Sequence, residues 1–159
     1  MSIKVLVIDD AIHIRRIIIR MLEQFDFVTL EAGDGLQGLQ KLQEEHPDIV
    51  TCDISMPVMD GYEFLAAAKN DPETKDIPVV VITAVGQEEE TIKSLEMGAD
   101  ACITKPFSSS HLVEVLQTQL KNRWARFQKA WANFLDFYPL LHLWEGRFSG
   151  YKPSRKIVC

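Results

Sequence analysis

The feature that most constrains the fold is the alternation of short, almost wholly apolar segments with longer segments of helical period. The short segments are rich in β-branched residues and cover residues 3–8, 27–30, 49–53, 79–83 and 101–104. The segments between them repeat apolar residues every three or four positions and cover residues 12–24, 35–45, 62–69 and 87–97, with another after Ser108. Strands this apolar are buried on both faces, so the pattern predicts an α/β domain with a doubly wound, five-stranded parallel sheet.

Residues at the segment boundaries support this division. Pro47 follows the second helical segment, and the residue before a proline avoids helical backbone angles. Gly98 ends the fourth helical segment, and Ser108 is a suitable N-cap for the fifth.

Polar side chains occupy the carboxyl ends of four predicted strands. Asp9 and Asp10 follow the first strand, Asp53 ends the third, Thr83 ends the fourth and Lys105 follows the fifth. Each residue alone has an ordinary structural explanation, such as a helix cap or a loop lysine. Because ligands of open α/β sheets bind beyond the carboxyl ends of the strands, the five together predict one functional site.

The residue types at this edge indicate phosphoryl chemistry. Three nearby carboxylates repel one another unless a cation neutralises them, and oxygen ligands suit Mg²⁺ or Mn²⁺. A carboxylate can attack phosphorus to form an acyl phosphate. Phosphoryl transfer depends mainly on positioning and charge neutralisation, which a metal ion and Lys105 could supply.

Four segments resemble those of the CheY-like response regulator receiver family of two-component signalling. They are VLVIDD (5–10), DIVTCDISMPVMDG (48–61), VVVITA (79–84) and GADACITKPF (98–107), in the family's order and spacing. The resemblance covers residues 1 to about 120 and implies strand order 2-1-3-4-5.

The resemblance also assigns roles in a metal site. Asp53 matches the phospho-accepting aspartate, which also contacts the metal. Asp10 matches a direct Mg²⁺ ligand, and Asp9 matches an acid that binds the metal largely through water. Ser55 stands where the family contributes a backbone carbonyl to the metal.

Other matching positions concern the phosphoryl group and the switch. Thr83 matches the hydroxyl that moves toward the phosphoryl group, and Lys105 matches the lysine that pairs with it. The resemblance implies a cis bond before Pro106. Cys102 replaces the family's usual Tyr or Phe, so a large ring rotation cannot report activation here. A redox role for Cys102 is the less favoured interpretation, and a small buried residue is the simpler one.

The resemblance implies a signalling switch rather than an enzyme with external substrates. The donor would be a histidine kinase or a histidine phosphotransfer protein, the downstream protein target is open, and slow autodephosphorylation would reset the switch. One alternative is an aspartate-nucleophile phosphohydrolase, which Ser55 disfavours because such enzymes need an acid two residues after the nucleophile. Another is a pseudo-receiver, which the complete set of strand-end residues disfavours.

Charge and cysteine content exclude several other classes. Residues 1–120 carry 9 Lys+Arg and 21 Asp+Glu (−12), whereas residues 121–159 carry 8 and 2 (+6). An acidic body is not expected to bind nucleic acid. The three cysteines show no C-x-x-C pair, and no signal peptide is recognisable, so a cytoplasmic location is predicted.

Composition divides the chain into a predicted receiver domain (1–122), an aromatic, amphipathic helical extension (123–145) and a basic tail with the composition of a disordered segment (146–159). Nine of the fourteen aromatic residues lie in residues 121–159. The extension could pack on the receiver, form a homodimer, or link to a domain that this chain lacks. Packing is favoured over membrane binding because Asp136 and Pro139 suit an interfacial helix poorly.

Overall fold

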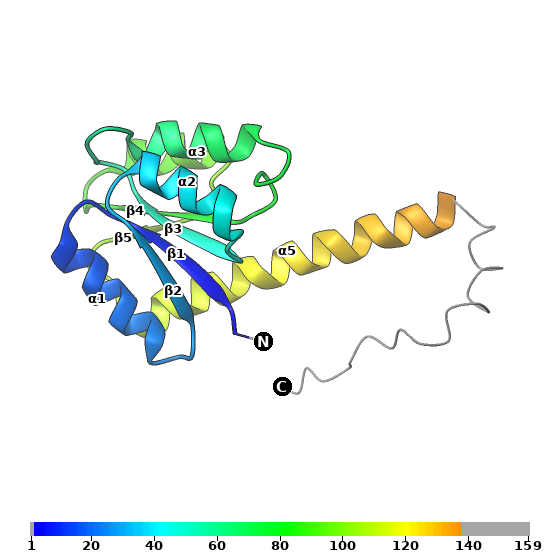
Figure 1. Ribbon diagram of the computed structural model, residues 1–159, viewed down its shortest axis with the longest axis horizontal. Helices are drawn as coiled ribbons and strands as arrows, with labels where there is room; N and C mark the ends of the chain where they lie inside the picture. Colours follow the sequence, from blue (N-terminus) through cyan, green and yellow to red (C-terminus); the bar gives the residue numbers. More distant parts are fainter. Residues whose placement is uncertain (1, 138–159) are drawn as a thin grey trace. The chain divides into compact units, whose positions relative to one another are not determined.

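A computed structural model describes the backbone of residues 2–137 and the side chains of residues 2–133 (Figure 1). The strands are β1 (Lys4–Ile8), β2 (Val28–Ala32), β3 (Ile49–Asp53), β4 (Val79–Thr83) and β5 (Ala101–Thr104). The helices are α1 (Ile12–Glu23), α2 (Gly35–Glu45), α3 (Gly61–Asn70), α4 (Glu88–Glu96) and α5 (Ser109–Phe137). The predicted α/β class, the five strands and the five helical segments of residues 1–120 are confirmed, with most boundaries within one or two residues.

The five strands form one parallel sheet in the order β2-β1-β3-β4-β5, as the sequence resemblance implied. The register pairs Ile8 of β1 with Cys52 of β3, and Thr83 of β4 with Thr104 of β5. The carboxyl ends of β1, β3, β4 and β5 therefore lie beside one another at one edge of the sheet.

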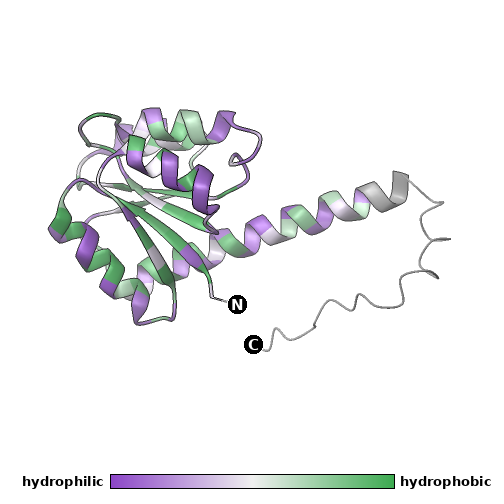
Figure 2. Ribbon diagram, in the orientation of Figure 1, coloured by the Kyte–Doolittle hydropathy of each residue, from purple (hydrophilic) through white to green (hydrophobic). Residues whose placement is uncertain are grey.

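Alternate residues of each strand enter two separate cores. Leu6 and Ile8 of β1 face the core shared with α2 and α3, whereas Val5 and Val7 face the core shared with α1 and the start of α5. The two helix layers on opposite faces are visible in Figure 1, and the mostly hydrophobic strands between them in Figure 2. The doubly wound arrangement thus follows from strands that are apolar on both faces.

The predicted helix ends have local causes. The Ser108 hydroxyl accepts a hydrogen bond from the His111 N–H at 3.1 Å, which caps α5. Gly98 has a φ of 101° and its N–H bonds the Leu95 carbonyl after α4. His46, before the proline, takes a left-handed conformation with a φ of 43° and ends α2.

Helix α5 continues without interruption to Phe137, as the sequence suggested for its aromatic segment. The chain divides into two compact units, residues 1–123 and residues 124–159. The expected bend at Pro139 and the tail of residues 146–159 lie outside the described residues. Within the part of the chain that is described, no helix combines the length and apolarity needed to cross a membrane.

Gly61 allows α3 to begin directly against the end of β3. Its N–H bonds the Ile54 carbonyl at 2.9 Å, and a Cβ at this position would collide with the Asp53 carbonyl oxygen. Asp60 caps the same helix, and its carboxylate accepts the Glu63 N–H in a reciprocal capping box. A glycine is therefore required where the chain turns beside Asp53.

We predict that Gly61→Ala destabilises the protein by about 1–3 kcal/mol, because backbone atoms must move to admit the methyl group. Urea denaturation followed by circular dichroism measures this change. Gly33→Ala is the matched control, since its Cβ would meet only side-chain atoms at 3.7–3.8 Å. Equal stability of the two variants would show that the close contact between Gly61 and the Asp53 carbonyl does not require a glycine.

Candidate functional site

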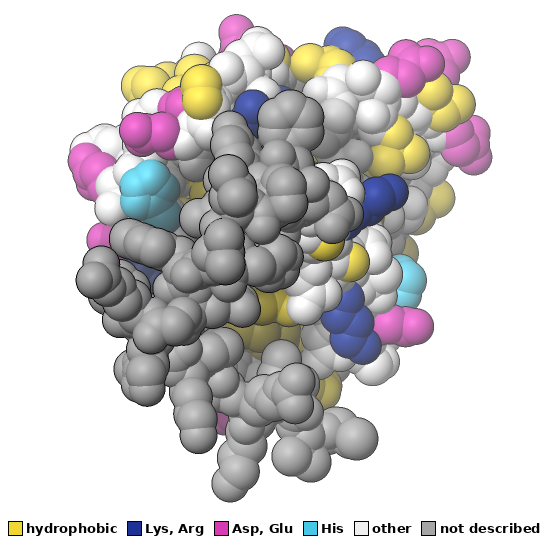
Figure 3. Space-filling view, turned by 90° about the vertical axis from the view of Figure 1, so that its right-hand side faces the viewer, with side chains coloured by type: hydrophobic (Ala, Val, Ile, Leu, Met, Phe, Trp, Pro, Cys, Tyr) yellow, Lys and Arg dark blue, Asp and Glu magenta, His cyan; other side chains and the backbone are white. Residues whose placement is uncertain are grey.

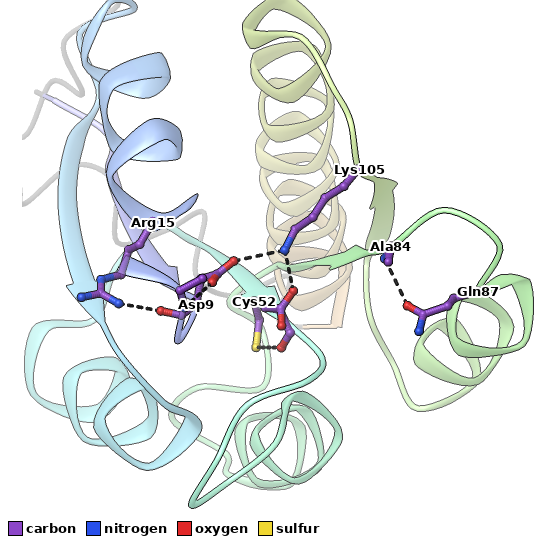
Figure 4. Close-up of polar contacts among 8 residues, drawn as sticks. Asp9, Arg15, Cys52, Ala84, Gln87 and Lys105 are labelled. Atoms are coloured by element: carbon purple, nitrogen blue, oxygen red, sulfur yellow. Dashed lines mark hydrogen bonds and ion pairs between the residues drawn. The ribbon is translucent and has the colours of Figure 1, made fainter. Parts of the chain in front are cut away.

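The end of one strand and the loops after two others bring two carboxylates to one ammonium group. Asp53 ends β3, Asp9 follows β1, and Lys105 follows β5. The Lys105 Nζ lies 2.8 Å from Asp53 Oδ1 and 3.3 Å from Asp9 Oδ2 (Figure 4). The sequence interpretation placed these residues at one edge of the sheet, and the structure joins them by direct ion pairs.

Burial controls the electrostatics of this group. Desolvation raises the pKa of Asp9, whose side chain is 2% exposed; Lys105 opposes that rise and the Asp53 charge adds to it. Burial alone would lower the pKa of Lys105, but the carboxylates of Asp53 and Asp9 outweigh it and raise that pKa. Lys105 is therefore held cationic as the counter-charge of two carboxylates.

Asp10 and Ser55 take no part in the ion pairs around Lys105. Both are exposed, in the turns that follow β1 and β3. The described residues contain no group of three Asp, Glu, His or Cys side chains close enough to hold a metal ion, so the expected convergence of three carboxylates is not seen. Asp9 and Asp53 still present carboxylate oxygens to one point, which is a donor chemistry suited to Mg²⁺.

Thr83 contributes a buried hydroxyl at the end of β4, the strand between β3 and β5. The residue is 2% exposed, and its Oγ1 has no hydrogen-bond partner within the described residues. Its carbonyl accepts the Lys105 N–H at 2.8 Å, so β4 directly fixes the start of the lysine loop. A buried hydroxyl without a partner costs free energy, which indicates that another group can be bound here.

Arg15 is a residue that the sequence interpretation missed. Its guanidinium donates to the Asp9 carbonyl at 2.7 Å (Figure 4). It also donates to the Glu31 carboxylate at 2.9 Å. Asp9 also accepts the Ala11 N–H at 2.8 Å, so the turn after β1 is held from two sides. These contacts orient the buried carboxylate toward Lys105.

The loops beside the site are also fixed locally. The Gln87 side chain accepts the Ala84 N–H at 3.2 Å, closing the turn between β4 and α4 (Figure 4). The Lys105–Pro106 peptide bond is cis. Val58, in the loop after Asp53, has a φ of 70°, which is unusual for a β-branched residue.

Cys102 lies beneath α4. Its Sγ is 3.7 Å from the Thr91 carbonyl, and burial raises the pKa of its thiol. The neighbouring Tyr62 ring is covered by Lys93 Nζ, 3.7 Å from the ring centroid. The small side chain of Cys102 thus occupies the partly buried space between β5 and α4.

Comparison with known proteins identifies the family. A family model described as the response regulator receiver domain matches residues 5–117. The chain belongs to this family. Its five-stranded sheet and five helices are the CheY-like α/β fold.

Relatives of this receiver domain include proteins of different lengths. The chain is 39% identical over 121 residues to the chemotaxis protein CheY of Listeria monocytogenes, covering 75% of this chain and 99% of that protein. It is 38% identical over 121 residues to the phosphate regulon transcriptional regulatory protein PhoB of Escherichia coli, covering 76% of this chain. The chain spans about half of the PhoB relatives' length (53%).

Solved structures give the same result. The chemotaxis response regulator CheY4 of Vibrio cholerae matches with a TM-score of 0.70 and 31% identity over 75% of this chain and 99% of that chain. NtrX of Brucella abortus, in complex with ADP, matches with a TM-score of 0.77 and 26% identity, over 82% of this chain and 30% of that chain. Family membership therefore rests on both sequence and fold.

We predict that Lys105→Met destabilises the protein by about 2 kcal/mol at pH 7.5, because two carboxylates lose their shared cation. Without the ammonium, the folded-state pKa of Asp9, which burial already raises, would lie further above its unfolded value. The loss should therefore shrink as the pH falls through that raised pKa. Urea denaturation at pH 7.5 and pH 4.5, in EDTA, measures the difference from the parent.

Lys4→Met is the control for Lys105→Met, since it breaks an exposed pair with Glu45 at 3.2 Å. Its effect should be small and nearly independent of pH. A Lys105→Met deficit that is the same at both pH values would show that the ammonium does not compensate the carboxylates.

We also predict that Val58→Asn stabilises the protein by about 0.5–1 kcal/mol, since asparagine tolerates the left-handed backbone conformation better than valine. Val58 is 77% exposed, so little apolar burial is lost. Thermal denaturation measures the gain, with Val28→Asn as the control because Val28 is an exposed valine in an ordinary strand. A lower melting temperature for Val58→Asn would refute the strain argument.

Proposed function

We propose that this receiver domain is a phosphorylation-driven switch in which Asp53 accepts a phosphoryl group. The observation that carries the proposal is the Lys105 ammonium bonded to the carboxylates of Asp53 and Asp9. The buried Thr83 hydroxyl at the end of β4, which has no hydrogen-bond partner among the described residues, adds to it. Asp53 is 13% exposed at its side chain, so it is the less buried of the two carboxylates. It is therefore more accessible to an incoming phosphoryl group.

In the proposed reaction, an Asp53 carboxylate oxygen forms a bond to phosphorus as the bond from phosphorus to the donor breaks. Lys105 would then pair with an oxygen of the new phosphoryl group and offset its charge. The Thr83 hydroxyl would donate to another phosphoryl oxygen, which satisfies its hydrogen-bonding capacity. Water attack on the acyl phosphate would later reset the switch.

The residues present fit a divalent cation such as Mg²⁺ or Mn²⁺. Asp9, Asp10 and Asp53 would hold it with their carboxylates, together with the Ser55 carbonyl. The cation would supply positive charge to the phosphoryl oxygens that Lys105 does not reach. The exposed position of Asp10 leaves it accessible for such a role.

The donor would be a histidine kinase or a histidine phosphotransfer protein. Such a protein must bring a phosphohistidine to Asp53 and therefore contact the surface around the site. A hollow of about 410 Å³ lies beside Lys105 and is lined by Ile14, Ile17, Ile18, Met21, Lys105, Pro106 and Phe107. Arg16 and Arg20 are exposed on α1, the helix that lines this hollow. A donor surface that combines apolar and acidic residues would therefore complement it.

The switch would act through α4, which is weakly anchored in the fold. Ser94 is its one buried residue among those described, and Cys102 beneath it is small. Movement of Thr83 toward a phosphoryl group would change the packing at the start of α4. Since no aromatic ring occupies position 102, we expect the change to appear as a shift of α4 itself.

Two alternatives make different predictions. A phosphohydrolase would release phosphate from many substrate molecules, although Ser55 is not an acid. A pseudo-receiver would not accept phosphate at all, although the ion-paired site is present. Free Cys52 and Cys102 are consistent with the reducing environment of the cytoplasm, which is the location we propose.

Incubation of the full chain with acetyl phosphate and Mg²⁺ tests the proposal. We expect up to one phosphoryl group per chain by intact mass spectrometry, and no labelling of Asp53→Asn. Asp26→Asn is the control, because Asp26 is exposed at the opposite end of the sheet and asparagine tolerates its φ of 61°. Catalytic phosphate release would favour the hydrolase, and an unlabelled parent would favour the pseudo-receiver.

A further inference from the structure

Helix α5 carries exposed aromatic side chains beyond Leu116, the last buried residue among those described. Trp124 is 57% exposed, Phe127 60% and Trp131 57%. Spacings of three and four residues place the three rings on one face of the helix, here called the aromatic stripe. The Trp124 and Phe127 rings stack with centroids 5.9 Å apart. Other hydrophobic side chains reach the surface among charged ones (Figure 3), whereas the stripe gathers three rings within about two helical turns, which indicates a binding surface.

Basic residues border the aromatic stripe. The helical period places Lys121 and Arg126 on opposite sides of the stripe, about 100° and 120° from its centre, and Lys129 on the far face. Residues 121–133 contain no acidic residue. Arg123 is set apart, because its guanidinium donates to a backbone carbonyl at 2.8 Å. The exposed part of α5 is therefore aromatic on one face and cationic at its borders, and Figure 2 shows hydrophobic and hydrophilic residues alternating along it.

This combination fits a lipid surface better than a second helix. Paired helices favour Leu, Ile and Val where they meet. A face of Trp and Phe with Lys and Arg outside it is instead typical of a helix that lies in the plane of a membrane interface. Lysine and arginine side chains at the border reach the head groups while the rings enter the acyl boundary. Two paired stripes would bring like charges together, whereas anionic head groups carry the opposite charge.

Two residues that the sequence interpretation counted against a membrane helix do not interrupt the aromatic stripe. Helix α5 continues to Phe137, and residue 136 falls on its polar side, about 160° from the centre of the stripe. Asp136 therefore takes a position that an interfacial helix reserves for polar residues. Pro139 comes after the stripe, outside the described residues.

We propose that the exposed part of α5 binds the surface of an anionic membrane, with the aromatic stripe inserted at the level of the head groups and Lys121 near the lipid phosphates. The helix lies on the bilayer, since no described helix is apolar enough to cross one. Residues 1–120 are acidic (−12) and contribute no attraction to such a surface. The binding free energy therefore comes from the stripe and its basic border.

Vesicle flotation of the full chain tests the proposal. With phosphatidylcholine vesicles that contain phosphatidylglycerol, we expect half of the protein to bind at about 0.1–1 mM lipid, the range of a single acyl anchor. Binding should be at least fivefold weaker to phosphatidylcholine alone, and should weaken as salt is raised. A parent chain that does not float at ten times that lipid concentration overturns the proposal.

Removal of two rings tests the aromatic stripe. Trp124→Ala/Phe127→Ala should weaken binding to the anionic vesicles at least tenfold, because apolar area is lost from the contact. Phe25→Ala, at an exposed aromatic of the receiver (45%), should leave binding unchanged. All three tryptophans lie within residues 124–144, so a blue shift of tryptophan emission on binding reports this segment alone. Unchanged binding of the double variant would show that basic charge alone attracts the chain, and would overturn the proposal.

Removal of two charges tests the basic border. Lys121→Gln/Lys129→Gln should weaken binding to the anionic vesicles at least fivefold and leave the weak binding to phosphatidylcholine alone unchanged. Lys75→Gln, at an exposed lysine of the receiver, is the control. Equal binding of the double variant and the parent would refute the anionic surface as the occupant of the stripe.

A second copy of the chain is the competing occupant. Sedimentation equilibrium distinguishes it: a parent that does not float but forms a dimer, which Trp124→Ala/Phe127→Ala dissociates, would overturn membrane binding. Circular dichroism confirms that each variant is folded. Labelling by acetyl phosphate should be retained in every variant, because none of the substituted residues lies at the Asp53 site. Membrane binding and phosphoryl acceptance can therefore fail separately.

Discussion

The site depends on one electrostatic constraint: two carboxylates at the end of a parallel sheet are tolerated because a lysine from the end of another strand lies between them. Asp9 is almost completely buried, so its charge has little access to solvent. Lys105 is more exposed, at 30% of its side chain, and bonds both carboxylates. Strand order brings these groups together, since β1 lies beside β3, and only β4 separates β3 from β5. The fold therefore concentrates charge at one edge, where an incoming anion can exchange contacts with groups already positioned.

Helix α4 follows the strand that ends at this edge, and it is the helix that we expect to move when the site changes. Most helices insert large apolar residues into a core, whereas α4 inserts Ser94, whose hydroxyl bonds the Glu90 carbonyl of its own helix. Little apolar area anchors it, so displacing it costs little free energy. Thr83 ends the strand that leads into α4, and its hydroxyl has no partner in the described part of the chain. A group that binds Thr83 would therefore act next to a helix whose one buried residue, among those described, is a serine.

The sequence predicted the elements well because apolar periodicity and boundary residues agree along the chain. It ended β2 at residue 30, whereas the strand extends to Ala32, because Glu31 breaks the apolar run while its backbone still pairs with Val7. The strand-end rule correctly joined Asp9, Asp53 and Lys105. The strand-end rule could not reveal that Asp10 is exposed, because its orientation depends on the turn after β1, which Arg15 holds. Arg15 lies on α1 and pairs with Glu31 of β2. Local sequence patterns do not predict this contact between two separate elements.

Two surfaces of the domain carry apolar residues beside opposite charges, which would favour different partners. The exposed Arg16 and Arg20 of α1 adjoin the hollow beside Lys105, whereas Glu88 and Glu96 flank the exposed Ile92 and Leu95 of α4. A partner with apolar and acidic residues would be attracted to the first surface and repelled by the second. Two partners of different charge would therefore bind at separate places on one small domain. Since Thr83 precedes α4, phosphorylation would alter the second surface without removing the first.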